Sequence, residues 1–304
     1  MTTRPVRRNR PNWVKQWTSR ETIAAWVFLF PSLIGFIAFY AVPAVRGLMI
    51  SFTDWDLLTE PTNVGLANYE RLLTDREFRN ALKVTFQYVL YNIPLQTSIA
   101  VVIAVMMDRL TKSTLVRGIL LLPWLMPNVI VALLFLWLLD PSLGIVNAAI
   151  EGMGFEGFGF FGNLKQAMPT IAGVNIWRHV GYTALLIFAG LQTIPASLYE
   201  AAAIDGANEW QSFWGVTVPL LRPVLAFVLV TSVIGSFQIF DTVAVTTEGG
   251  PINVTEVLNW LIFERAFERF DMGYATTVSM ALFVMLIIVS LIQMRLLRAD
   301  ESDY

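Results

Sequence analysis

The hydrophobic residues of the chain gather into six long runs, separated by connections that carry most of the charge. A helix needs about 20 predominantly apolar residues to cross the hydrocarbon core of a bilayer. The runs that meet this requirement lie at about 22–45, 84–107, 115–139, 168–191, 220–245 and 275–297. The pattern therefore predicts an all-α, polytopic membrane protein with six transmembrane helices.

Positive charge is concentrated on alternate connections, which predicts the orientation of the chain. Lys and Arg next to a span mark its cytoplasmic side. Six cations and no acid lie in residues 1–20, three more cations lie in 108–117, and Arg295 and Arg298 follow the last run. Both termini and the connection 192–219 are therefore predicted to be cytoplasmic. The connections predicted to lie outside are 52–83, 140–167 and 246–274.

This orientation divides the chain into a basic cytoplasmic tail (1–20), a transmembrane domain (21–298) and a short cytoplasmic tail (299–304). A basic tail before an apolar run is also typical of a secretory signal. The first run is long and contains Pro31 at its middle, so we interpret it as an uncleaved first span.

The composition supports a membrane protein and narrows its chemistry. Hydrophobic residues make up 56% of the 304 positions and charged residues only 14%, whereas soluble domains carry about 25% charged residues. The chain has no cysteine and one histidine, His179, which excludes disulfides, thiolate metal sites and multi-histidine metal centres. It contains no Gly-Lys dipeptide and therefore no phosphate-binding P-loop. The formal net charge of −2 gives no reason to expect a nucleic-acid partner.

Prolines and one outer connection add detail to this picture. Proline inside a helix removes a hydrogen bond and favours a kink, and the apolar runs contain Pro31, Pro94, Pro123 and Pro127. Apolar residues recur at helical spacing over 255–270, with charged residues among them. That pattern predicts an amphipathic helix lying in the outer membrane interface.

The connection between the fourth and fifth runs has an unusual sequence, LYEAAAIDGANEWQSFWGVTVPLLRP at 198–223. Ser197, with Glu200 three residues later, predicts a capping box at the start of a short helix, and Gly206 predicts a turn or a close approach by another backbone. The segment carries three acids and no cation before Arg222. Helices that rest on the anionic inner leaflet are usually basic, so an acidic, alanine-rich helix is better explained by docking on a protein.

This segment resembles the EAA loop of bacterial ATP-binding-cassette (ABC) importer permeases. That motif reads Glu-Ala-Ala, three residues, Gly, nine residues and Ile-x-Leu-Pro. In this chain Glu200-Ala201-Ala202, Gly206 and Pro219 fall in register. Val216 and Val218 replace the isoleucine and the leucine, which are conservative departures. Several positions at fixed spacing make the resemblance specific.

The resemblance covers nearly the whole chain and indicates the carbohydrate branch, the maltose and glycerol-phosphate permease type. The stretches that carry it are FLFPSLIGFIAFYAVPAVRGLMISFTDWD, GLANYERLLTDREFRNAL, LLPWLMPNVIVALLFLWLLDPSLGIVN and TTEGGPINVTEVLNWLIFERAFERFDMGYATTVS. The turn Glu248-Gly249-Gly250-Pro251 is especially suggestive of that branch. The maltose-type partner with extra N-terminal spans and a large outer domain is not matched, because only six spans fit here.

The resemblance implies a type I ABC importer permease fold, with a coupling loop at 197–219, in a bacterial cytoplasmic membrane. It implies that the chain forms half of a pathway for a sugar or sugar-like solute. The expected partners are a second, different permease chain, two cytoplasmic ATP-binding subunits and an extracytoplasmic solute-binding protein. ATP and Mg would be bound by the ATP-binding subunits, so this chain is expected to hold no cofactor and to be no enzyme itself. The residues that the resemblance assigns to coupling are Glu200, Ala201, Ala202, Asp205, Gly206 and Pro219.

Polar residues inside the fourth and fifth runs are candidates for the solute pathway. On the fourth run, one helical face carries Asn175, Arg178, His179 and Tyr182, spaced i, i+3, i+4, i+7. On the fifth run, one face carries Ser232, Gly235 and Ser236. Amide, imidazole and guanidinium groups hydrogen-bond sugar hydroxyls, and an aromatic ring stacks on the apolar face of a sugar. The resemblance places the pocket on these same two helices. Weaker candidates, which hydrogen bonds between helices explain as well, are Asn92, Gln96, Asn128 and Gln238.

Two questions stay open at the level of sequence. Arg178 either lines the pathway or pairs structurally with a carbonyl or with Asp241, and a pathway arginine would suit an anionic solute or a neutral sugar. An ion-coupled secondary transporter is the alternative function, and it would require buried carboxylates, for which only Asp241 qualifies. An integral membrane enzyme would require a clustered acid/base or metal set, which a single histidine does not provide.

Overall fold

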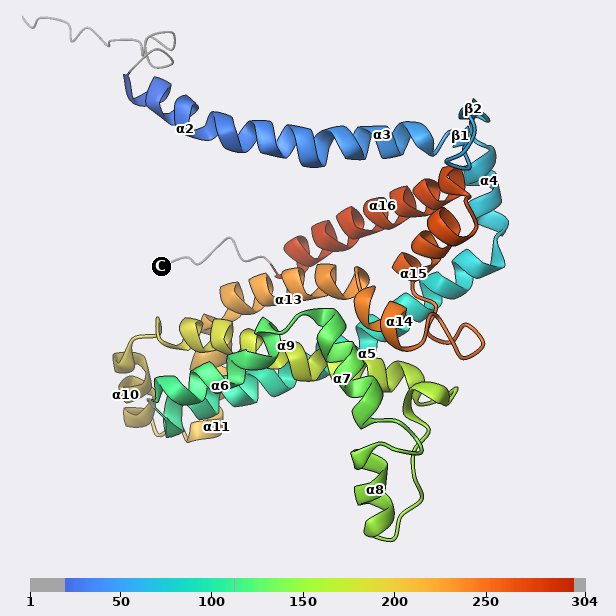
Figure 1. Ribbon diagram of the computed structural model, residues 1–304. Coiled ribbons are helices and arrows are strands. Elements are labelled where there is room, and N and C mark those ends of the chain that lie inside the picture. The colour runs from blue at the N-terminus through green and yellow to red at the C-terminus, as the bar shows by residue number, and fades with distance from the viewer. Residues whose placement is uncertain (1–19, 112, 298–304) are drawn as a thin grey trace, which may run out of the picture.

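The computed structural model describes residues 20–111 and 113–297, whose regular structure is almost entirely helical (Figure 1). The longer helices are α2 (Arg20–Phe36), α3 (Val42–Ile50), α5 (Arg76–Leu110), α6 (Thr114–Leu125), α7 (Asn128–Leu138), α9 (Ala167–Leu191), α13 (Arg222–Phe237) and α16 (Met272–Leu297). The shorter helices are α4 (Ala67–Thr74), α8 (Ile145–Gly152), α10 (Ala196–Ile204), α11 (Glu209–Ser212), α12 (Val218–Leu220), α14 (Asp241–Thr246) and α15 (Leu258–Phe263). Strands β1 (Thr53–Asp54) and β2 (Thr62–Asn63) pair antiparallel. Residues 1–19 of the tail predicted at 1–20, and the whole tail predicted at 299–304, lie outside the described residues.

By length and apolar composition, the described residues contain four helices that could span a membrane, and six if each of two bent helix pairs counts as one span, as predicted. Four are single candidates, Ala24–Ile50, Arg76–Leu110, Arg222–Thr246 and Met272–Leu297. The other two are bent pairs, α6 with α7 at 91° and α9 with α10 at 71°. The second span starts earlier than the hydrophobic run predicts, because Asp75 caps α5 by accepting a hydrogen bond from the Glu77 amide (2.9 Å).

The third span is broken, although its apolar pattern predicts one helix. α6 ends at Leu125 and α7 begins at Asn128. Pro127 has an extended ψ of 139° and no N–H to donate, so the helix cannot continue through it. Proline alone does not decide this outcome, because α2 continues through Pro31 and α5 through Pro94.

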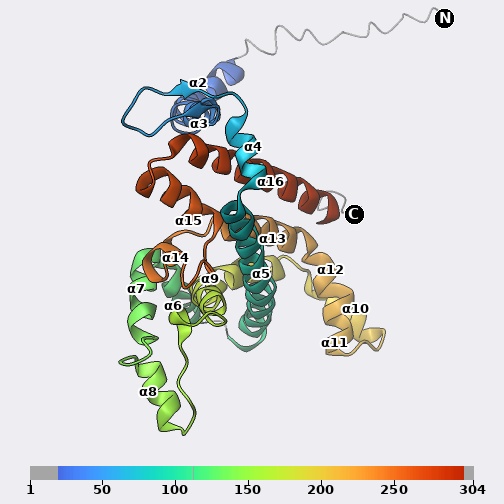
Figure 2. The same ribbon diagram turned by 90° about the vertical axis from the view of Figure 1, so that its right-hand side faces the viewer.

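The centre of the bundle is formed by α5 and α9, with α6 and α13 packed against them (Figure 2). The crossing of α6 and α9 is very close: a Cβ added to Gly181 would lie 1.8 Å from the Leu120 carbonyl oxygen. The first span lies at the edge of the bundle, where α3 packs on α16. Its most apolar stretch is not buried by the chain itself.

The two ends of the bundle carry different segments. In Figure 1, α10, α11, the start of α2 and the end of α16 lie at one end. The strands, α4, α14 and α15 lie at the other end. This grouping matches the predicted alternation of inner and outer connections. Which end faces the cytoplasm stays a prediction.

The segment 255–270, which was predicted to lie outside, does not form the expected helix in the membrane interface. It forms α15 and a π-helical turn (Glu264–Glu268), and its apolar face is buried by the protein: Leu258 is 1% exposed and Leu261 0%. The Leu258 amide also donates to Thr85 Oγ1 (2.9 Å) on α5. The helix predicted from the spacing of apolar residues is present, but its apolar side packs on α5 and α16.

Charged residues fix this outer segment to the start of α5. Arg265 lies 2.5 Å from a carboxylate oxygen of Glu77 and 3.7 Å from one of Asp75. Arg269 bridges Glu77 (3.3 Å) and Glu264 (2.8 Å). A network of partly buried charges therefore holds together segments that are far apart in the sequence.

Candidate translocation site and coupling loop

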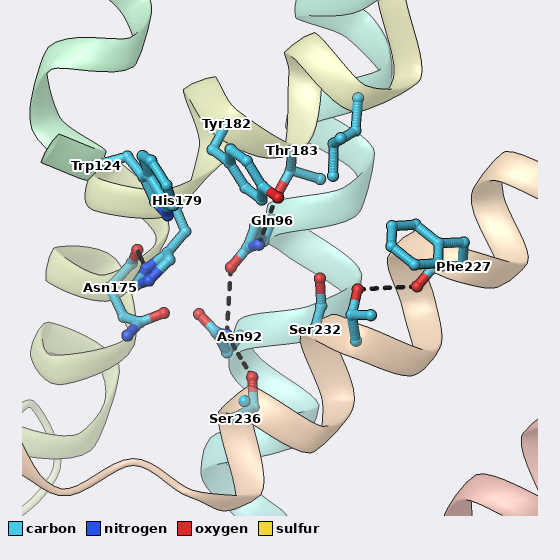
Figure 3. A pocket seen from close by; sticks show the side chains of 13 residues that line it. Asn92, Gln96, Trp124, Asn175, His179, Tyr182, Thr183, Phe227, Ser232 and Ser236 are labelled. Atoms are coloured by element: carbon cyan, nitrogen blue, oxygen red, sulfur yellow. Dashed lines mark hydrogen bonds between the residues drawn. The ribbon is translucent and has the colours of Figure 1, made fainter. Parts of the chain in front are cut away.

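A hollow of about 210 Å³ lies between α5, α6, α9 and α13, and we call it the central hollow (Figure 3). It is lined by Asn92, Gln96, Trp124, Asn175, His179, Tyr182, Thr183, Leu186, Phe227, Thr231, Ser232, Gly235 and Ser236. The residues that line it come from four helices and extend from Asn92 to Ser236 in the sequence. The two polar faces that were predicted on α9 and α13 lie opposite each other across the hollow.

A chain of buried hydrogen bonds forms one wall of the central hollow. Asn92 Nδ2 donates to Ser236 Oγ (2.8 Å) and to Gln96 Oε1 (3.3 Å), and Gln96 Nε2 donates to Thr183 Oγ1 (3.0 Å). These bonds join α13, α5 and α9. Asn92 Oδ1 is buried and accepts no hydrogen bond from any described residue. A buried amide oxygen without a donor is costly, so this atom is suited to a donor that arrives with a ligand.

Aromatic rings form another part of the lining. The rings of Trp124 and Tyr182 stack with centroids 4.5 Å apart and an interplanar angle of 8°. Phe227 and Leu186 add apolar surface from α13 and α9. Amide and hydroxyl groups beside aromatic faces are the arrangement that a sugar needs, because a sugar presents hydroxyls at its edge and C–H groups on its faces.

The structure brings six of the seven predicted pathway residues to the central hollow: Asn175, His179, Tyr182, Ser232, Gly235 and Ser236. The weaker candidates Asn92 and Gln96 line it as well. Asn128 lies elsewhere and donates to Asp241 Oδ2 (2.6 Å), and Gln238 does not line the hollow.

Five lining residues were not predicted from the sequence: Trp124, Thr183, Leu186, Phe227 and Thr231. Thr183 and Thr231 are next in sequence to the predicted Tyr182 and Ser232, so a wider helical face would have included them. No local signal marks Trp124, which reaches the hollow only because α6 crosses α9 closely.

Arg178 is the predicted pathway residue that does not line the central hollow. Its guanidinium donates to Met126 O (2.8 Å from Nη2, 3.1 Å from Nε) and to Trp124 O (3.1 Å). These are carbonyls freed where α6 ends. Arg178 therefore pairs with carbonyls, which was the alternative to lining the pathway. Through these bonds it links α9 to the break between α6 and α7.

Replacing Arg178 with alanine should lower the thermal stability of the detergent-purified protein by about 1.5–3 kcal/mol, the range for a hydrogen bond to a charged group. The freed carbonyls would lose their donors at the break in the third span. Lysine at this position should restore only part of the loss, because it lacks the planar fork that reaches two carbonyls. Thermal unfolding of the three proteins would test this, and equal stability of Arg178→Ala and the unsubstituted protein would contradict it.

The EAA segment, residues 197–219, projects from the bundle. α10 follows Pro195, whose φ and ψ are −62° and 133°, and no side chain caps it, so the capping box predicted at Ser197 is wrong. Ser197 lies inside the helix because α10 starts at Ala196, directly after the proline and two residues before the predicted start at residue 198. A capping box does form further on, between Asn208 and Gln211 at the start of α11.

The EAA segment exposes most of the residues that the motif singles out. Glu200, Asp205 and Gly206 are all exposed, and Ile204 is 87% exposed. Gly206 has a φ of +82°, so the predicted turn is confirmed, and a Cβ added there would meet no atom beyond its chain neighbours within 4 Å. Arg109 at the end of α5 forms an ion pair with Glu209 (2.5 Å).

Pro219 belongs to a separate apolar hollow at the base of the EAA segment. This hollow is lined by Pro195, Leu198, Gly215, Val216, Pro219 and Leu220. Pro219 thus packs where the chain leaves and re-enters the bundle, and the exposed tip is formed by α10 and the turn at Gly206. An acidic, partly apolar tip without a covering element in the described chain is suited to a protein partner.

Helical spans, a polar hollow within them and an exposed segment at one end define an integral membrane transport subunit. Residues 96–299 match the family model described as binding-protein-dependent transport system inner membrane component. The chain is 35% identical to the probable ABC transporter permease protein YesP of Bacillus subtilis (strain 168), over 93% of this chain and 92% of that protein. The chain belongs to this family and is the permease subunit of an ABC importer.

Two further comparisons agree with this identification. The trehalose/maltose transport system permease protein MalF of Thermococcus litoralis is 31% identical, over 91% of this chain and 94% of that protein. The fold is that of a subunit in the crystal structure of a bacterial ABC transporter involved in the import of the acidic polysaccharide alginate, with a TM-score of 0.81, 22% identity and coverage of 95% and 99% of the two chains. Ion-coupled secondary transport finds no support in these comparisons.

Proposed function

We propose that the central hollow is half of the path by which a sugar or sugar-like solute crosses the membrane, and that the EAA segment couples this path to ATP hydrolysis by partner subunits. One observation carries the proposal. The two helices that present polar faces to the hollow, α9 and α13, are the helices that the EAA segment connects. A force applied to the exposed tip would therefore reach both walls of the hollow.

Two ATP-binding subunits would hold ATP and Mg, because this chain contains no phosphate-binding P-loop. Each ATP-binding subunit would receive one EAA segment through Glu200, Ala201, Ala202, Asp205 and Gly206. Closure of these subunits on ATP would draw the two EAA segments together and tilt α9 and α13. Nucleotide that binds the closed state more tightly shifts the population from an inward-facing to an outward-facing hollow.

A second permease chain would supply the other half of the path. The central hollow measures about 210 Å³, which is below the ≈ 300–1,000 Å³ typical of a complete ligand pocket. An extracytoplasmic solute-binding protein would deliver the solute at the end that carries the strands and α15. Both termini would lie in the cytoplasm of a bacterium, with the chain in its cytoplasmic membrane.

Sugar as the solute class rests on the lining and on the relatives. The lining combines amide and hydroxyl groups with stacked aromatic rings. One relative is named as a trehalose/maltose transport permease, and the transporter with the matching fold imports the acidic polysaccharide alginate. These solutes are all carbohydrates, but they differ in charge.

The proposal is tested by reconstituting the complete complex in proteoliposomes with the permease, ATP-binding and solute-binding proteins that co-purify with this chain. Sugar-loaded binding protein should stimulate ATP hydrolysis and uptake of labelled sugar together. Omitting the ATP-binding subunits should abolish uptake. Uptake by this chain alone, driven by an ion gradient, would contradict the proposal.

A further inference from the structure

We infer that the transported sugar is electrically neutral, which rests on the proposed function of the central hollow as half of the solute path. An anionic sugar such as a uronate or a sugar phosphate would meet no cation on the walls that the described residues of this chain contribute to the site. The inference follows from four features of the site: the composition of the lining, the position of Arg178, the hydrogen bonds of His179 and an unpartnered oxygen of Asn92.

The lining of the central hollow contains no Asp, Glu, Lys or Arg among the described residues. Its polar groups are amides, hydroxyls and one imidazole. Moving an anion from water into an apolar environment without a paired charge costs far more than moving a hydroxyl that finds a hydrogen bond. Uncharged groups alone therefore accept a neutral solute in preference to an anionic one.

The nearest intramembrane cation is already committed to the protein. Arg178 directs its guanidinium to the Trp124 and Met126 carbonyls at the end of α6, and it does not line the hollow. The carbonyl end of a helix carries partial negative charge, which compensates the guanidinium locally. Releasing Arg178 for an anionic solute would break three hydrogen bonds at the bend of the third span.

His179 is held in its neutral form by its two partners. Its Nδ1 lies 3.0 Å from the Asn175 carbonyl oxygen, which only accepts, so Nδ1 carries the proton. Its Nε2 lies 2.8 Å from Arg178 Nη1, which only donates, so Nε2 accepts. An imidazolium would present an N–H to the guanidinium N–H and a second positive charge beside the first. His179 therefore lines the hollow without charge.

The unpartnered atom in the hollow is suited to a hydroxyl donor and not to the anionic group of a charged sugar. Asn92 Oδ1 is buried and lacks a donor among the described residues, and Figure 3 shows the Asn92 side chain directed toward Asn175. An amide oxygen accepts a hydrogen bond from a sugar hydroxyl. A carboxylate or phosphate oxygen has no proton to donate and would be repelled by it. Hydroxyl donors are thus what this position requires.

The test uses the purified complex in detergent without the solute-binding protein, so that only the membrane site selects the ligand. Saturation-transfer NMR would compare matched pairs of probes, each a methyl glycoside and its uronic acid, for glucose, galactose and mannose. At least one neutral glycoside should give a signal, and its uronic acid should bind at least tenfold more weakly in competition. Gln96→Leu should remove the neutral signal, whereas Gln87→Leu, on the same helix and outside the hollow, should retain it.

Two results would overturn the inference, and they are distinguishable. A uronic acid that binds as well as its glycoside, with loss of binding in Gln96→Leu, would show a charged sugar in the same site and leave the sugar permease proposal standing. Binding of neither member of any pair by a complex that still hydrolyses ATP would overturn the sugar assignment together with this inference.

Discussion

Gly206→Val should abolish solute-stimulated ATP hydrolysis by the assembled transporter while the permease remains folded in the membrane. Gly206 has a φ of +82°, a backbone conformation that costs a residue with a Cβ about 1–2 kcal/mol and a β-branched residue more. A Cβ at this position meets no other atom within 4 Å, so the strain acts on the turn after α10 and leaves the bundle packing intact. We expect the tip of the EAA segment to be displaced, so that it no longer fits the ATP-binding subunit.

Gly154→Val is the matched control for this experiment. Gly154 has a φ of +85° and equally open surroundings, but it lies in the loop after α8, outside the EAA segment. Both variants therefore introduce the same backbone strain, and only one places it in the EAA segment. ATP hydrolysis and membrane abundance would be measured for both. Equal coupling in the two variants would contradict a role for the EAA segment.

Glu200→Lys tests the proposed contact between the EAA segment and the ATP-binding subunit by reversing a charge. Glu200 is exposed on α10 and forms no ion pair with any described residue, so its replacement should leave the fold unchanged. A lysine would reverse the charge presented to the ATP-binding subunit and should reduce stimulated hydrolysis at least tenfold. Glu156→Lys, which replaces an exposed acid in the loop after α8, should have no such effect. Normal stimulation in Glu200→Lys would remove this residue from the interface.

Gly181→Ala should destabilise the bundle itself. An added Cβ would lie 1.8 Å from the backbone oxygen of Leu120, and a backbone atom cannot rotate away as a side chain can. Overpacking a core typically costs about 1–3 kcal/mol and occasionally more, and contact with a backbone places this variant at the upper end. α6 would have to move away from α9, which would also separate the stacked rings of Trp124 and Tyr182.

Gly173→Ala, on the same helix, is the control for this variant. Its Cβ would meet no atom outside its own turn within 4 Å, so alanine should be tolerated or mildly stabilising through its higher helix propensity. Thermal unfolding of the detergent-purified proteins would show a lower midpoint for Gly181→Ala only. Equal midpoints for the two variants would show that the α6–α9 crossing is looser than the structure indicates.

The candidate site was predictable in part, and Arg178 shows where the prediction stopped. Helical spacing placed Arg178 on the same face as Asn175, His179 and Tyr182, and that grouping is correct along α9. A long, flexible side chain at the edge of such a face can turn toward either neighbour. The break at Pro127 creates free carbonyls on one side, and these attract the guanidinium away from the hollow.

The outer segment 255–270 shows a similar limit for the fold. Its helical repeat was visible in the sequence, but a repeat does not say whether lipid or protein covers the apolar side. Arg265 makes the difference clear, because its partners Asp75 and Glu77 lie almost 190 residues earlier in the chain. Such pairing depends on how the start of α5 packs against the π-helical turn that follows α15, and it has no local signal in the sequence.

The sequence by itself determined the six apolar spans, the acidic EAA segment and the family, because hydropathy, helical period and motif spacing are local properties of the chain. Only the tertiary structure decided which side chains share the central hollow. Trp124 on α6, Asn92 on α5 and Ser236 on α13 meet there because of how the helices rotate and cross. A step of one residue turns a helical side chain by about 100°, so small differences in helix rotation and in the position of a break decide what faces the hollow.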